Sequence, residues 1–112
     1  MRQFIAMTLE KIPGVVAMTA EDGAEALEIA KRTSHLDLVI TDLNMPVLGG
    51  LALLERLHEV PSARDAAFVV VSSETGDQAA ARARGAHRYL TKPVKQPQIL
   101  SVAEDMLSLS EW

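Results

Sequence analysis

A short apolar run, Leu38-Val39-Ile40, constrains the fold of this chain most strongly. Almost unbroken runs of β-branched and aliphatic residues are typical of strands that are buried on both faces, as in parallel sheets covered by helices. The run ends at the carboxylate of Asp42, and Met45-Pro46 and Gly49-Gly50 then favour an irregular loop. We therefore expect Asp42 at an open strand end, either as a turn or helix-capping residue or as a functional carboxylate.

Helical and strand patterns alternate along the rest of the chain. The expected helices are Met1–Ile12, Ala24–Thr33, Leu53–Val60, Asp77–Arg84 and a last one beginning near Pro97, and the expected strands are Val15–Ala20, Leu36–Thr41, Ala67–Val71 and Arg88–Thr91. This alternation predicts the α/β class, with a parallel sheet and helices on both faces, in a single domain that spans residues 1–112.

Two of the helices carry local signals. Asp22 is expected to cap the helix that follows it, with Glu25 three residues later as in a capping box. The helix Asp77–Arg84 offers only alanines as its apolar face, which predicts a weakly anchored and movable element.

Composition excludes several classes of function. The formal charge of −4 and the scattered basic residues disfavour nucleic-acid binding. The absence of cysteine removes disulfides and thiolate chemistry and is compatible with a cytoplasmic location. The longest apolar run, Ala66–Val71, is too short to span a bilayer, and polar residues interrupt any signal peptide in Met1–Ile12. With only two Phe, one Tyr and one Trp, the core must be aliphatic.

Polar side chains follow each predicted strand. They are Glu21-Asp22, Asp42, Ser72-Ser73-Glu74 and Lys92. Right-handed crossovers place the carboxyl ends of parallel strands at one edge of the sheet, so these side chains should converge. A carboxylate nucleophile beside an ammonium and a hydroxyl can accept a phosphoryl group, because the cation and the donor neutralise charge on its oxygens. Taken singly, Ser72 reads as a turn hydroxyl and Lys92 as a solvated lysine.

Other catalytic motifs are missing from the sequence. There is no G-x-x-x-x-G-K-[ST] or G-x-G-x-x-G pattern for nucleotides. His35, His58 and His87 lack the spacing of a metal site or an H-E-x-x-H motif.

The combined motifs resemble the receiver domains of two-component response regulators, especially the stand-alone chemotaxis type. The matching segments are Glu21-Asp22-Gly23 with Ala26-Leu27, Asp37 to Pro46 with Gly50, Val71-Ser72-Ser73-Glu74, Gly85-Ala86 and Tyr89-Leu90-Thr91-Lys92-Pro93. The resemblance implies a flavodoxin-like doubly wound sheet.

The resemblance also implies roles for single residues. Asp42 is then the phosphoacceptor, Ser72 the switch hydroxyl, Lys92 the lysine that pairs with the phosphoryl group, and Tyr89 the rotating aromatic. Asp42 and the Asn44 carbonyl would bind Mg²⁺, while the Asn44 and Glu74 side chains would tune dephosphorylation. A cis bond between Lys92 and Pro93 is also implied, and such bonds cost little before proline.

One departure from the family concerns the start of the sequence. Family members begin with an apolar strand, central in the sheet, that ends in an acidic pair holding Mg²⁺; here the first predicted element is a helix. Three explanations are open. A segment preceding the given sequence supplies the strand, or a second copy covers the exposed edge in a homodimer. Alternatively, Val15–Ala20 pairs with Leu36–Thr41 and brings Glu21-Asp22 toward Asp42. Without the acidic pair, Mg²⁺ binding is expected to be weakened or lost.

The expected function is a phosphoacceptor signalling module that receives a phosphoryl group from a histidine kinase on Asp42. Its output would be contact with a downstream protein through the helix Asp77–Arg84, the last strand and the last helix, and not turnover of an external substrate. The alternative is a phosphorylation-independent interaction or dimerisation module. An aspartate-nucleophile phosphohydrolase is disfavoured because Asp42-Leu43-Asn44 lacks a second acid two residues on.

Overall fold

The computed structural model describes residues 2–12, 15–20, 22–42, 49–72 and 78–110. In this part of the chain, three parallel strands form a sheet in the order β1 (Leu38–Asp42), β2 (Ala67–Ser72) and β3 (Arg88–Thr91). Strand β2 lies in the middle, and from Phe68 onward its side chains are buried. This confirms the predicted parallel α/β architecture.

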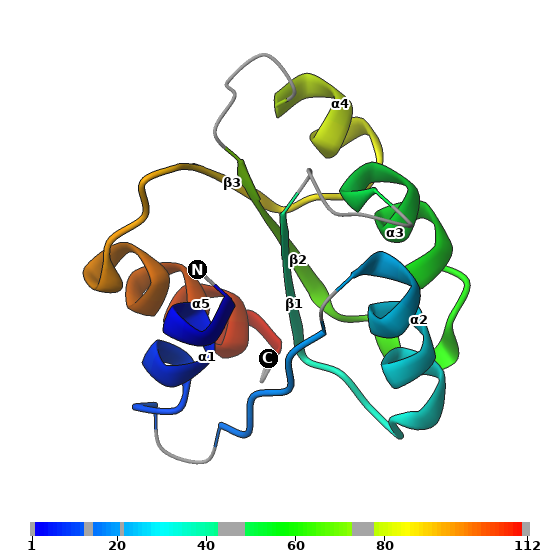
Figure 1. Ribbon diagram of the computed structural model, residues 1–112, viewed down its shortest axis with the longest axis horizontal. Coiled ribbons are helices and arrows are strands. Elements are labelled where there is room, and N and C mark those ends of the chain that lie inside the picture. Colours follow the sequence, from blue (N-terminus) through cyan, green and yellow to red (C-terminus); the bar gives the residue numbers. More distant parts are fainter. Residues whose placement is uncertain (1, 13–14, 21, 43–48, 73–77, 111–112) are drawn as a thin grey trace.

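Helices cover both faces of the sheet (Figure 1). Helices α1 (Arg2–Leu9) and α5 (Gln96–Ser110) pack against each other on one face, where they enclose a small apolar cluster with β1 and β2. Helices α2 (Gly23–Arg32), α3 (Gly50–Leu57) and α4 (Gln78–Ala83) contribute to a larger cluster on the other face. The fully buried side chains of that cluster include Leu53, Leu54, Leu57, Phe68, Val70, Ala63 and Ala81. The core is mainly aliphatic, as predicted, with Phe68 as its one fully buried aromatic residue among those described.

A short 3-10 helix, η1 (Pro61–Ala63), fixes the start of β1. The buried Ser62 hydroxyl donates to the Ala30 carbonyl at the end of α2, with an oxygen–oxygen distance of 2.6 Å. The Ser62 carbonyl in turn accepts the Leu36 N–H at 2.8 Å. These bonds satisfy polar groups that would otherwise be buried without partners, and they set where the chain enters β1.

Most of the predicted elements are present with bounds that differ by a few residues. Strand β3 has the predicted bounds, and α2 begins after Asp22, whose carboxylate accepts the Glu25 N–H at 2.8 Å. The predicted cap is therefore confirmed. Helix α4 is shorter than expected and buries only Ala81.

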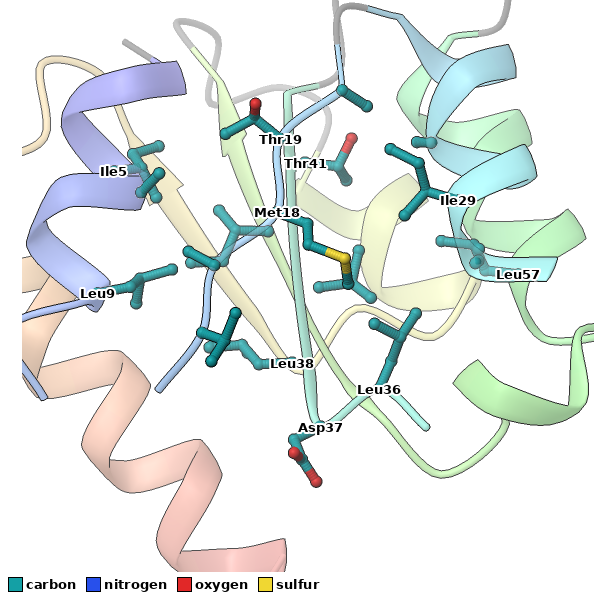
Figure 2. Close-up of a pocket in the computed structure, with 18 of the residues that line it drawn as sticks. Ile5, Leu9, Met18, Thr19, Ile29, Leu36, Asp37, Leu38, Thr41 and Leu57 are labelled. Atoms are coloured by element: carbon teal, nitrogen blue, oxygen red, sulfur yellow. The ribbon is translucent and has the colours of Figure 1, made fainter. Parts of the chain in front are cut away.

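The strand predicted at Val15–Ala20 is wrong. These residues carry no strand assignment and take no part in the three-stranded sheet, so the hypothesis that they pair with β1 is wrong as well. The Val15 N–H bonds to the Ile12 carbonyl and the Ala17 N–H reaches the Glu10 carboxylate, which ties the segment to the end of α1. A cavity of about 650 Å³ lies beside both β1 and this segment (Figure 2). A strand requires a neighbour with which to form its ladder, and the described sheet pairs none with this segment.

Candidate functional site

Asp42 and Lys92 meet at the carboxyl edge of the sheet. Asp42 is the last residue of β1, and Lys92 directly follows β3. The Lys92 ammonium forms an ion pair with the Asp42 Oδ2, and the two side chains are 26% and 28% exposed for Lys92 and Asp42 respectively. The pair is thus accessible from solvent, but it is shielded enough for the charges to interact more strongly than on an open surface.

The sheet register explains why residues 50 positions apart come together. Asp42 lies opposite Val71 of β2, and the next residue, Ser72, lies opposite Thr91 of β3. The Lys92 N–H then donates to the Ser72 carbonyl at 2.7 Å, which continues the ladder for one more bond. This backbone bond fixes Lys92 beside the end of β2, and the Lys92 side chain reaches Asp42 from that position.

Ser72 ends β2 between the two charged residues and is fully buried. The sheet therefore places the three predicted catalytic residues, Asp42, Ser72 and Lys92, at the ends of three neighbouring strands. The peptide bond between Lys92 and Pro93 is cis, which confirms the bond implied by the family resemblance.

Tyr89 lies on β3 opposite Val70 and is half-buried, with its side chain packed against the larger apolar cluster. Its predicted rotation is not tested by one conformation. Asn44 and Glu74, together with Glu21 of the pair Glu21-Asp22, lie outside the described residues.

The described residues do not by themselves form a magnesium site. In that part of the chain, no group of three or more His, Cys, Asp or Glu side chains could hold a metal ion. Asp42 supplies one carboxylate, which Lys92 already engages, while the Asp22 carboxylate caps α2. Mg²⁺ requires several oxygen ligands in near-octahedral geometry, so this donor set is insufficient.

The arrangement does fit the acceptance of a phosphoryl group. A carboxylate at an open strand end is a suitable nucleophile, and an ammonium in contact with it stands where negative charge would develop. A buried hydroxyl on the intervening strand adds a hydrogen-bond donor in the same region.

Comparisons with known proteins agree with this interpretation. The family model of the response regulator receiver domain matches residues 1–104. The chain therefore belongs to the response regulator receiver domain family, whose members are signalling modules of two-component systems.

Particular relatives and one solved structure show how far the likeness extends. The response regulator receiver protein Anae109_2439 of Anaeromyxobacter is 39% identical over 85 residues, which are 74% of this chain and 34% of that protein. The chain thus spans about a third of that relative. The chemotaxis protein CheY homolog of Campylobacter jejuni is 28% identical over 96% of this chain and 84% of its own length. The structure of the chemotaxis response regulator CheY4 of Vibrio cholerae superposes with a TM-score of 0.85 at 29% identity, covering 95% of this chain and 88% of that one.

Sequence reasoning missed two features. It gave the histidines no role, yet His58 and His87 both lie beside the Phe68 ring, and the His87 Nδ1 accepts the buried Phe68 N–H at 2.9 Å. No local pattern signals this contact, because it joins residues 19 positions apart. The apolar cavity beside β1 was also missed, since a space between elements leaves no mark on the sequence.

No helix in the described ranges is long and apolar enough to cross a membrane.

Proposed function

We propose that this chain, as a single receiver domain over residues 1–112, is a phosphoacceptor module of a two-component phosphorelay in the cytoplasm. A histidine kinase would supply the phosphoryl group as phosphohistidine. The observation that carries the proposal is the Asp42–Lys92 ion pair at the strand ends of a chain that belongs to the receiver family.

The transfer would use the side chains at the sheet edge. An Asp42 carboxylate oxygen attacks phosphorus, the bond between phosphorus and the kinase imidazole nitrogen breaks, and its electron pair returns to that nitrogen. Lys92 leaves its ion pair with the free carboxylate and stabilises the charge on the phosphoryl oxygens. The Ser72 hydroxyl donates to the same oxygens, and Tyr89 moves as that hydroxyl moves.

The output would be a change in the surface formed by α4, β3 and α5. Helix α4 buries only Ala81 among its side chains, so little apolar contact resists its displacement. A downstream protein that binds the displaced arrangement better than the resting one would shift the population toward it. On this proposal the chain changes state once for each phosphoryl group and does not turn over an external substrate.

We also propose that Mg²⁺ binds weakly, through Asp42 and the Asn44 carbonyl. A bound Mg²⁺ would contribute positive charge beside the phosphoryl oxygens. Its affinity is expected to be low because the described residues offer one carboxylate at this place.

Intact-mass measurement after incubation with acetyl phosphate tests the proposal. We expect the wild-type chain to gain a single phosphoryl group, to a greater extent as Mg²⁺ is added, and the Asp42→Asn variant to gain none. Lys92→Ala should reduce the labelled fraction, because the ammonium that stabilises the transferred charge is lost. The Arg64→Ala variant changes an exposed residue with no described side-chain contact and serves as the control. Equal labelling of wild-type and Asp42→Asn chains would contradict the assignment of Asp42.

The second candidate is a phosphorylation-independent interaction or dimerisation module. It is favoured by the lack of a carboxylate cluster among the described residues, which weakens the case for metal-assisted phosphoryl transfer. An unlabelled wild-type chain at saturating Mg²⁺ would support this alternative.

A further inference from the structure

Two hydrogen bonds join Phe68 and His87 at the amino ends of β2 and β3, at the opposite edge of the sheet from Asp42. The His87 N–H donates to the Phe68 carbonyl at 2.7 Å, and the Phe68 N–H donates back to the His87 Nδ1 at 2.9 Å. The two rings also stack, with centroids 6.2 Å apart and planes inclined by 10°. We call this pair of hydrogen bonds the histidine clamp.

We propose that the histidine clamp is a proton-sensitive latch. It holds the start of β3 on β2 while His87 is neutral, and proton uptake by His87 opens it. Strand β3 belongs to the proposed output surface, so acid would loosen that surface at one end. The inference concerns the response of the fold to acid and does not rest on phosphorylation of Asp42.

The geometry fixes the charge of His87 in the closed clamp. A backbone N–H can only donate, so the Nδ1 that accepts it carries a lone pair, and the hydrogen of the neutral ring lies on Nε2. In the imidazolium form both ring nitrogens are donors, so a protonated His87 would oppose one N–H with another. Phe68 is fully buried, and leaving its N–H without an acceptor is costly. The closed clamp therefore excludes the charged ring.

The pH range and the direction of the effect follow from this exclusion. Histidine is the side chain that ordinarily changes charge between pH 5 and pH 8. His87 is exposed, so a proton from solvent reaches the ring without unfolding of the chain. Because the open form can bind a proton that the closed form excludes, opening becomes more favourable as the pH falls through this range. The clamp is therefore closed at pH 8 and opens increasingly toward pH 5.

The charged groups around His87 offer no compensation for a proton. The carboxylates on the elements packed around it are Glu55, Glu59 and Asp65. Glu55 pairs with Arg84, and in the described ranges none of the three forms an ion pair with His87. The other ionisable groups on these elements are His58, Arg64, Arg82, Arg84, Arg88 and Tyr89. Arg88 donates to the His87 carbonyl at 3.1 Å, so the nearest described charge is positive.

His58 contacts the same aromatic ring but should respond differently to acid. Its Nε2 bonds to the Arg84 carbonyl at 2.9 Å, and because a carbonyl only accepts, this nitrogen carries a hydrogen in the neutral and the charged ring alike. Proton uptake by His58 therefore keeps its bond. The ion pair between Arg84 and Glu55 also connects the end of α4 to α3. Opening of the histidine clamp should thus be confined to the start of β3.

Amide hydrogen exchange followed by NMR at pH 8 and pH 5 tests the inference. Each rate is divided by that of an unstructured chain at the same pH. The references are Val70 in the middle of β2 and Lys92, whose N–H bonds to the Ser72 carbonyl at the far end of β3. Relative to both references, protection of the Phe68 and His87 amides should fall about tenfold or more at pH 5. Ring nitrogen spectra at pH 8 should show the His87 hydrogen on Nε2.

Three variants assign the effect to one histidine. His87→Asn places an amide oxygen where Nδ1 accepts, so the acceptor no longer titrates, and relative protection at the two pH values should agree within about twofold. His58→Gln keeps a donor for the Arg84 carbonyl without a titrating ring and should retain the wild-type pH dependence. His35→Asn removes the exposed histidine that pairs with Asp37 and should retain it as well.

Several results would overturn the inference. In the wild-type chain these are equal relative protection at pH 8 and pH 5, an equal loss at Lys92, which would indicate general destabilisation, or a hydrogen on the His87 Nδ1 at pH 8. In folded variants they are an unchanged pH dependence in His87→Asn or a lost one in His58→Gln. The wild-type measurements decide the matter if a variant does not fold. None of them involves a phosphodonor, so the inference and the proposed function can fail separately.

Discussion

At the scale of single residues, the backbone conformation of Gly85 restricts which amino acids can occupy the position. It ends the turn after α4 with a φ of 100°, a conformation that L side chains rarely adopt. A Cβ at this position would lie 2.2 Å from the His58 Nε2, which bonds to the Arg84 carbonyl at 2.9 Å. Gly85→Ala therefore combines backbone strain of about 1–2 kcal/mol with a steric clash, and should lower the free energy of unfolding by more than the strain alone. Urea denaturation measures the loss.

The two contributions at Gly85 can be separated in a second background. In the His58→Ala chain the imidazole is absent, so Gly85→Ala should cost only the backbone strain. The difference between the two backgrounds is the coupling energy of the pair. An identical cost in both backgrounds would show that His58 moves aside freely.

The residues predicted to be catalytic illustrate what could be predicted at this scale. Asp42 and Lys92 each follow a predicted strand, so the expectation that they converge needed only the parallel topology, and the structure joins them in an ion pair. The contact between His87 and the Phe68 N–H could not be predicted in the same way. Here a side-chain nitrogen accepts the Phe68 N–H. A backbone carbonyl would satisfy this buried donor equally well, so the sequence does not favour either partner.

At the scale of elements, Asp22 shows a carboxylate that serves structure. Its Oδ1 accepts the Glu25 N–H at the start of α2, where the helix dipole also favours negative charge. Asp22→Ala should lower the free energy of unfolding by about 1 kcal/mol, while Asp22→Asn, which keeps the accepting oxygen, should lose less. Thermal and urea denaturation measure both variants.

Acetyl phosphate labelling of these two variants tests the assignment of Asp22. Asp22 caps α2, and the Asp42 carboxylate pairs with Lys92. The labelled fraction of both Asp22 variants at saturating Mg²⁺ should therefore match that of wild type. A loss of labelling in both folded variants would mean that Asp22 also acts at the phosphoacceptor site.

Elements also differed in how well sequence patterns predicted them. The strand Arg88–Thr91 was predicted correctly because its residues fit a half-buried position beside β2. Val15–Ala20 has equally strong β-type residues, yet it forms no strand. Strand formation depends on a partner at about 4.8 Å, and local preference does not provide one.

At the scale of the whole molecule, stability should decrease from the middle of the sheet toward β1. Strand β2 has neighbours on both sides and buried side chains from Phe68 to Ser72, whereas β1 has one described neighbour and, apart from the buried Thr41, half-buried side chains. In native-state hydrogen exchange, the amides of Phe68–Val71 should exchange through global unfolding, and those of Leu38–Ile40 at lower free energies. Uniform protection across both strands would show that the open edge of β1 is covered in solution.

The overall architecture was predictable because helical and strand patterns alternate along the chain, and this alternation admits few topologies. The cavity beside β1 was not, because segments that are far apart in the sequence line it together.

The ion pair between Asp42 and Lys92 has a mechanical consequence. Asp42 ends strand β1 and Lys92 directly follows strand β3, so their contact bridges the end of β2 and connects strands that share no ladder in the described sheet. Lys92 also begins the connection into α5. We therefore expect a change of charge at Asp42 to act, through the Lys92 side chain, on the end of β3 and on the start of the connection into α5.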